Sequence, residues 1–116
     1  SSMARWTWAS RALASGLPPP VRVKAVENLI VAYRRIGEHE RAFGFCRDLI
    51  DGPVFSMTAV EGAAIYYERI AGDRVGAIAV IERAIRGLDE TAENRRFLML
   101  LRTRWERLQQ KTMAFQ

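Results

Sequence analysis

The feature that most constrains this chain is an internal repeat with a period of about 34 residues. Residues 25–51 can be laid over residues 59–86, so that Ala-Val-Glu at 25–27 matches Ala-Val-Glu at 59–61. The offset is 34 up to Ile36 and Ile70, and 35 from the following glycines onward, because Ala71 is one additional residue. A repeat of this length indicates helical hairpins that stack on one another to bury a continuous core.

The spacing of the apolar residues is helical throughout, so we expect an all-α fold. One helical domain should cover residues 3–116. The expected parts are a leading helix (3–15), two antiparallel hairpins (21–51 and 56–88) and a capping helix (91–112). Within the hairpins the helices are expected at 21–36, 38–51, from Ser56 or Thr58 to about residue 71, and from Asp73 to about residue 88.

Local signals define the ends of these helices. Gly37 and Gly72 each follow a first helix and can adopt the left-handed backbone angle that closes a turn. Thr58 and Glu61 have the spacing of a capping box, and Asp73 is a suitable N-cap. Small side chains then allow the paired helices to approach closely. The residues expected to serve in this way are Ala42, Ala77 and Ala84.

The last helix is expected to seal the repeat array with an apolar inner face and a polar outer face. On a helical wheel Phe97, Leu98, Leu101, Trp105 and Leu108 share one face. The net charge is +5 for the whole chain and +4 for residues 91–116. Four cations are predicted opposite the apolar face, as a structural cap or as contacts to phosphates. They are Arg96, Arg104, Arg107 and Lys111.

These residues resemble the tetratricopeptide repeat (TPR) family at its helix-packing positions, over about residues 21–88. The matches are Tyr33, Gly37, Ala42 and Cys46 in the first copy, and Ala64, Tyr67, Gly72, Ala77, Ile81 and Ala84 in the second. The resemblance implies a short right-handed solenoid whose concave groove binds a protein or peptide. The implied groove residues are Lys24, Glu27, Val31 and Arg34, then Thr58, Glu61, Ile65 and Glu68.

The resemblance does not extend to every TPR ligand. Chaperone-type members hold a C-terminal carboxylate with a lysine and an asparagine, at positions where this chain has Glu27 and Val31. We therefore do not expect that ligand in this groove. The groove would present both signs of charge, so its partner should not be uniformly acidic.

A second resemblance concerns the helical tail behind bacterial RNase-H-like exonuclease domains. It is carried by Tyr66-Tyr67-Glu68-Arg69, by Gly72-Asp73, and by the basic pattern of Arg102, Arg104, Arg107, Leu108 and Lys111. This resemblance implies an accessory domain that contacts a phosphate backbone near a separate catalytic domain. The sequence leaves two functions open, a non-catalytic protein-interaction scaffold and this nucleic-acid accessory role.

We expect no catalytic, cofactor or metal site. Cys46 and His39 lie seven residues apart on one helix, about 10 Å along its axis, and do not form a nucleophile–base pair. A single cysteine favours a reducing cytoplasm. The apolar run 97–101 is far shorter than the roughly 20 residues that cross a bilayer. A homodimer through Trp6, Trp8 or the tail residues Met113 and Phe115 would also be compatible with the sequence.

Overall fold

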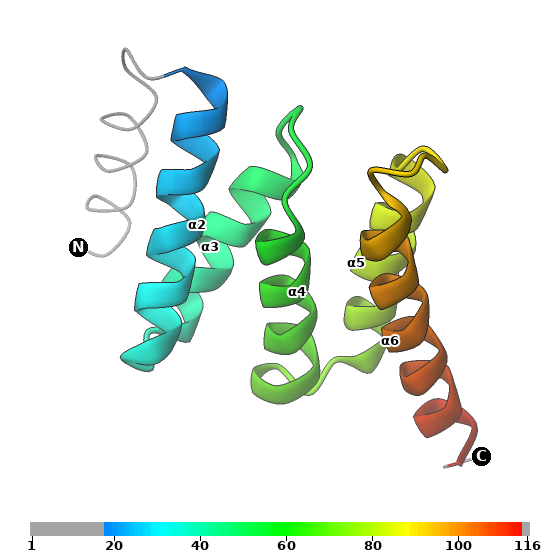
Figure 1. Cartoon of the computed structure of the whole chain (residues 1–116). Coiled ribbons are helices and arrows are strands. Elements are labelled where there is room, and N and C mark those ends of the chain that lie inside the picture. The colour runs from blue at the N-terminus through cyan, green and yellow to red at the C-terminus, as the bar shows by residue number, and fades with distance from the viewer. Residues whose placement is uncertain (1–17, 115–116) are drawn as a thin grey trace. The chain divides into compact units, whose positions relative to one another are not determined.

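Every element of the described structure, a computed structural model that covers residues 18–114, is helical (Figure 1). The elements are α2 (Pro19–Arg35), α3 (His39–Ile50), α4 (Met57–Ile65), the π-helical turn η1 (Tyr66–Ile70), α5 (Arg74–Gly87) and α6 (Arg95–Ala114). No strand occurs among these residues, which confirms the all-α prediction. The predicted leading helix, with Trp6 and Trp8, and the tail residue Phe115 lie outside the described residues. The chain forms two compact units, 1–62 and 63–116, with the boundary inside α4.

In the first unit, α2 packs against α3 (Figure 1), and apolar and aromatic side chains fill the contact. Tyr33 stacks on Phe45 with ring centroids 5.8 Å apart, and the Arg41 guanidinium lies 5.8 Å from the centroid of the Tyr33 ring. Ala42 is buried, as the repeat predicts. The fully buried side chains of this helix pair include Ile30, Phe45 and Cys46.

The start of α4 differs from the predicted capping box. Thr58 lies inside the helix, and the residue that caps it is Ser56, whose Oγ accepts a hydrogen bond from the Ala59 N–H (3.1 Å). The Ser56 hydroxyl in turn donates to Oε2 of Glu27 on α2 (2.7 Å). Because Ser56 is buried, the carboxylate of Glu27 supplies the acceptor that the hydroxyl proton needs away from water. Of the two starts that the sequence left open, Ser56 and Thr58, the structure has Ser56, and the capping box predicted at Thr58 and Glu61 was wrong because spacing alone does not include the contact from α2.

Helix α4 contains a buried glycine that sets how closely it meets α3. A Cβ built on Gly62 would lie 2.7 Å from Sγ of Cys46 and 3.5 Å from Cγ2 of Ile30. Real Cβ atoms do not approach sulfur to that distance, so only glycine fits at this contact. The predicted role for small side chains is thus filled here by a residue that the repeat comparison did not single out.

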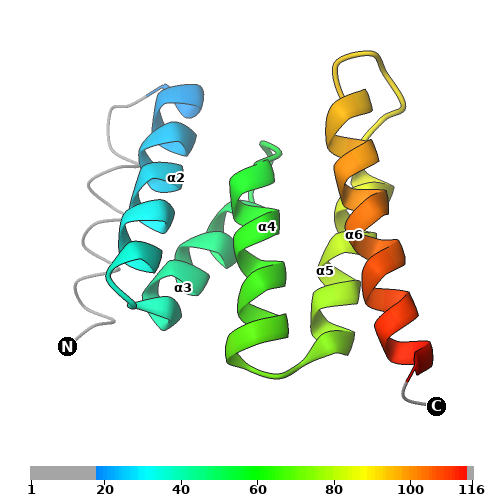
Figure 2. The same cartoon turned by 60° about the horizontal axis from the view of Figure 1, so that its bottom comes forward.

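In the second unit, α5 packs against both η1 and α6 (Figure 2). Its buried residues are Ala77 and Ile81, and those of α6 are Leu98, Leu101 and Leu108. The predicted apolar face of the last helix is therefore confirmed, whereas Ala84 is only half-buried. Helix α6 begins at Arg95 rather than near residue 91, because residues 89–94 form a hydrogen-bonded turn first.

The two copies close their turns with equivalent hydrogen bonds. The Glu38 N–H donates to the Tyr33 carbonyl (2.9 Å), and the Asp73 N–H donates to the Tyr67 carbonyl (2.7 Å), across one more residue. The glycine before each donor, at position 37 or 72, has a positive φ, of 80° or 66°. The extra residue of the second copy is accommodated by the wider π-helical turn of η1, since such a turn arises when one residue is inserted into an α-helix. Asp73 is the N-cap of α5, as predicted, and accepts from the Gly76 N–H (2.9 Å).

The contact at Gly62 predicts a specific double-mutant result. Gly62→Ala should lower the free energy of unfolding by about 1–3 kcal/mol through overpacking against Cys46. In a Cys46→Ala background the same substitution should be neutral, or stabilising by up to about 1 kcal/mol, because alanine favours the helix and the sulfur is gone. Urea unfolding of the four proteins in this cycle measures both values.

Gly87→Ala is the matched control, since a Cβ at Gly87 would meet nothing within 4 Å. It should not destabilise either background. If Gly62→Ala were as well tolerated as Gly87→Ala in the parent chain, the close approach of α4 to Cys46 would be disproved.

Candidate functional site

The second unit has a cleft of about 490 Å³ beside the first half of α6. Its wall on the loop side comes from residues 90–92, and its other wall is one face of the helix. The side chains that define its chemistry are Glu90, Ala92, Arg95, Met99, Arg102 and Glu106. Leu98 closes the floor and is 3% exposed, whereas Met99 is 60% exposed. The volume falls within the range of roughly 300–1,000 Å³ that is typical of ligand pockets.

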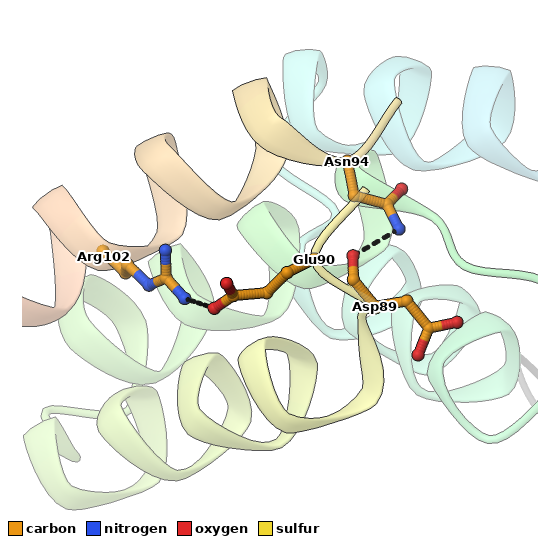
Figure 3. Close-up of polar contacts among 4 residues, drawn as sticks. All are labelled: Asp89, Glu90, Asn94 and Arg102. Atoms are coloured by element: carbon orange, nitrogen blue, oxygen red, sulfur yellow. Dashed lines mark hydrogen bonds and ion pairs between the residues drawn. The ribbon is translucent and has the colours of Figure 1, made fainter. Parts of the chain in front are cut away.

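The loop side of this cleft is held in place by hydrogen bonds (Figure 3). The Asn94 side-chain amide donates to the Asp89 carbonyl (3.0 Å), and the Asn94 N–H donates to Oγ1 of Thr91 (3.3 Å). The Glu90 side chain extends from the loop to Arg102 on α6, with Oε1 and the guanidinium nitrogen 2.6 Å apart. Both side chains are well exposed, at 76% for Glu90 and 50% for Arg102. The pair therefore crosses an open mouth and is not part of the core.

The groove positions predicted on the first unit occupy one face of α2 and the start of α4. Lys24 is exposed, Val31 is 38% exposed, and Arg34 is half-buried. Glu27 is half-buried and is already hydrogen-bonded to Ser56, so its carboxylate has a structural use. The α4 positions Thr58 and Glu61 are half-buried. These residues remain a predicted partner surface.

In the second unit the predicted groove residue Glu68 has a different environment from the one expected. Its side chain is 14% exposed, and its two carboxylate oxygens lie 3.3 Å from Nζ of Lys111 and 3.6 Å from the guanidinium of Arg107. A carboxylate enclosed by two cations of α6 is not open to a partner in the way a groove residue would be. The other groove position of this unit, Ile65, is half-buried.

The same ion pairs correct the prediction for the basic face of α6. Arg104 and Lys111 lie four residues before and three residues after the buried Leu108, so they flank the apolar face and do not oppose it. Arg104 is half-buried, and Lys111 and Arg107 converge on Glu68. Of the four predicted phosphate contacts, Arg96 is exposed and is not one of the two cations that converge on Glu68. At 100° per residue Arg104 and Lys111 fall only about 40° and 60° from Leu108, so the prediction that they oppose the apolar face was wrong. The pairing with Glu68 involves another element, which a helical wheel does not include.

The residues of the cleft were missed as a site, although the repeat contains the signal for them. Moving the second-copy groove positions forward by 34 residues leads to four positions on and before α6, and all four line the cleft. The three sets are Lys24, Glu27, Val31 and Arg34, then Thr58, Glu61, Ile65 and Glu68, then Ala92, Arg95, Met99 and Arg102. The same register relates Ile30, Ala64 and Leu98, which are 0%, 1% and 3% exposed. Helix α6 therefore continues the repeat register on both its buried and its exposed faces.

Cys46 is a packing residue in this structure. It is fully buried, and this burial raises the pKa of its thiol to about 12, with Arg34 opposing the shift only in part. A thiol that stays protonated at neutral pH is a poor nucleophile and a poor metal ligand. His39 is exposed at the start of α3. Within residues 18–114, no cluster of three or more His, Cys, Asp or Glu side chains could hold a metal ion.

No protein-family model, curated protein or solved structure matches this chain. The TPR resemblance therefore rests on the repeat itself. None of the helices formed by the described residues has the length and apolar character needed to cross a bilayer.

The buried thiol predicts a defined pH dependence of stability. Burial raises the pKa of this thiol from its ordinary value of 9.0 to about 12 in the folded chain. The stabilisation that depends on the protonated thiol is therefore complete below pH 9 and is lost as the pH rises from 9 to 12. In that window the free energy of unfolding should fall by up to about 1.4 kcal/mol per pH unit from this group. The difference in unfolding free energy between the parent chain and Cys46→Ala should therefore shrink between about pH 8 and pH 10. Urea unfolding at each pH measures it, and a difference that does not change would contradict this role of the thiol.

Proposed function

We propose that this chain is a non-catalytic protein-interaction module, built as a short TPR-like right-handed solenoid, that binds a segment of a partner protein in the predicted concave groove. The observation that carries the proposal is the coincidence between the repeat register and the cleft. Four residues reached by extending the predicted groove by one period line a concave site of ligand-pocket size. A reducing cytoplasm is the compartment that the single cysteine favours.

The exposed faces of the helices have the composition of an interaction surface. Val31 and Met99 are apolar, occupy the same register position, and are 38% and 60% exposed. Cations and carboxylates flank them, with Lys24 and Arg34 near Val31 and with Arg95, Arg102 and Glu106 near Met99. Apolar side chains supply most of the affinity of such surfaces, and the surrounding charges select the partner.

Charge reversal at Glu61 should change which peptides bind without unfolding the chain. Short random peptides selected by phage display on the parent protein should lose at least about tenfold in affinity on Glu61→Lys, because a groove charge selects among partners. Fluorescence anisotropy with the selected peptides measures the affinity, and circular dichroism checks that the helices persist.

Asp48→Lys provides the control, since it makes the same change of charge on the exposed side of α3. The selected peptides should bind this variant as they bind the parent chain. Equal loss in both variants, or no loss in Glu61→Lys, would contradict the groove. Unfolding of Glu61→Lys would show that this side chain is structural and would contradict its placement as well.

A second function, contact with a nucleic-acid backbone, is favoured by the density of cations on α6. This helix carries six Arg or Lys residues and one carboxylate, Glu106. Its electrostatics are weaker than the composition implies, since Arg107 and Lys111 are paired with Glu68 and Arg102 is paired with Glu90. The protein-interaction function is therefore the better supported of the two.

Salt titration separates these functions. Labelled single-stranded DNA and RNA should bind weakly, if at all, at about 50 mM salt, because few cations of α6 are free to replace counterions. A phosphate-binding surface with four free contacts would instead lose about 100-fold in affinity between about 50 and 200 mM salt. It would also lose binding on Arg104→Gln and Arg107→Gln, whereas Arg35→Gln on α2 would have no effect. That pattern would replace our proposal with the nucleic-acid function.

A further inference from the structure

The cleft beside α6 has a charge pattern that specifies the chemistry of an occupant. Along the helix face, Arg95, Met99, Arg102 and Glu106 follow one another at intervals of three or four residues. With a rise of 1.5 Å per residue, they form a row about 16 Å long. Its order is a cation, an apolar group, a second cation and a carboxylate. An extended peptide of about five residues covers that distance.

We propose that this cleft binds an extended protein segment that places a carboxylate side chain on Arg102 beside an apolar side chain on Met99, and that Glu90 occupies Arg102 as an internal substitute until such a segment displaces it. The inference rests on the proposed interaction function. It specifies the chemistry of the partner segment that the α6 positions, one period after the second copy, would bind.

Glu90 has the position of a competitor. Its carboxylate lies on the loop side of the cleft and holds the Arg102 guanidinium at 2.6 Å across the mouth (Figure 3). The exposure of both partners limits the strength of this pair, since exposed ion pairs contribute little to stability. A carboxylate of a bound segment can therefore replace Glu90 at small cost, and Asn94 keeps the loop in place meanwhile through its bond to the Asp89 carbonyl.

The apolar part of the site is Met99. Its side chain is 60% exposed at the cleft, above a floor formed by Leu98. A flexible thioether adapts to apolar side chains of different shapes, which suits contact with a short sequence motif. Burial of this side chain by a leucine of the bound segment adds apolar contact between the two sites for carboxylates.

The lining charges favour a peptide over a polyanion. Glu90 and Glu106 stand in the same cleft as Arg95 and Arg102, so the four formal charges cancel. A nucleic-acid backbone would meet two carboxylates here and would gain little, whereas a peptide with separate acidic and basic side chains matches the row. The free C-terminal carboxylate of a partner is not required, because the row is open along its length.

The test uses the full chain and the peptide acetyl-Glu-Ala-Leu-Ala-Glu-Ala-Lys-amide, in which the two glutamates, the leucine and the lysine all face one side of an extended chain. The reversed sequence is tested beside it, since the cleft does not fix the direction of the bound chain. The readouts are the methyl resonance of Met99, assigned by comparison with Met99→Leu, and the Arg102 side-chain N–H. One of the two peptides should give saturable shifts at both. Replacing both glutamates of the peptide by glutamine should weaken binding by about five- to tenfold, as expected for two exposed ion pairs.

Variants of the chain distinguish displacement of Glu90 from simple attraction. Glu90→Gln should strengthen peptide binding by about two- to fivefold, because it removes the competitor. Arg102→Gln should weaken it by about the same factor and should abolish the advantage of the Glu90→Gln background. Arg96→Gln is the control, since this exposed arginine of α6 does not line the cleft, and it should leave the affinity unchanged.

Several results would overturn the inference. Binding that is unchanged or weaker in Glu90→Gln removes the competitor role, and equal binding of the glutamine peptide removes the charge recognition. If the peptide shifted the methyl resonances of Val31 on α2 and left that of Met99 unchanged, binding at the cleft would be disproved, but the proposed interaction function would be supported. Absence of shifts with either peptide would also overturn the cleft, and the peptides selected by phage display would still test the proposed function by themselves.

Discussion

The fold depends on the close approach of helices at positions where a side chain would not fit. Gly62 faces Cys46 so closely that a Cβ atom on it would lie 2.7 Å from the sulfur. Ala42 on α3 and Ala77 on α5, the helices that follow the two turns, are almost fully buried. Close packing at such points lets small side chains exclude water from the Cys46 thiol, and this burial raises the pKa of the thiol. In a chain of this length, a few contacts of this kind account for much of the specificity of the packing.

The acidic residues show how packing redistributes charges that a sequence presents as equivalent. Glu27 and Glu61 match in the repeat, but the carboxylate of Glu27 supports the cap of α4 through the Ser56 hydroxyl. Glu68 is enclosed by Arg107 and Lys111, so two of the cations that suggested a phosphate-binding face are partly neutralised. A polar residue in a repeat can therefore be structural in one copy and available to a partner in the next, depending on which side chain approaches it.

The repeat predicted the all-α architecture, the turns at Gly37 and Gly72, the N-cap at Asp73 and the apolar face of α6, because each depends on local spacing or backbone conformation. It did not predict the cap at Ser56, the close contact at Gly62 or the pairing of Glu68, because each depends on an atom from another element. The π-helical turn is intermediate between these cases. The additional residue Ala71 was visible in the repeat, but the change of offset does not by itself show that the chain accommodates this residue by widening the end of the helix. The residues of the cleft were also within reach of the sequence, had the period been applied once more.

Helix α6 has features that a cap alone does not require. A helix that only sealed the end of an array would need a polar outer surface, yet Met99 and Leu100 are 60% and 42% exposed. Met99 lies at the position that Val31 and Ile65 hold in the earlier copies, and Arg95 and Arg102 lie at the neighbouring positions of the same register. Exposed apolar side chains are common on any surface, but here they coincide with a cleft and with an ion pair across its mouth. The buried face of α6 explains stability, and the proposed recognition of a peptide rests on the row of charges that surrounds Met99 on the exposed face.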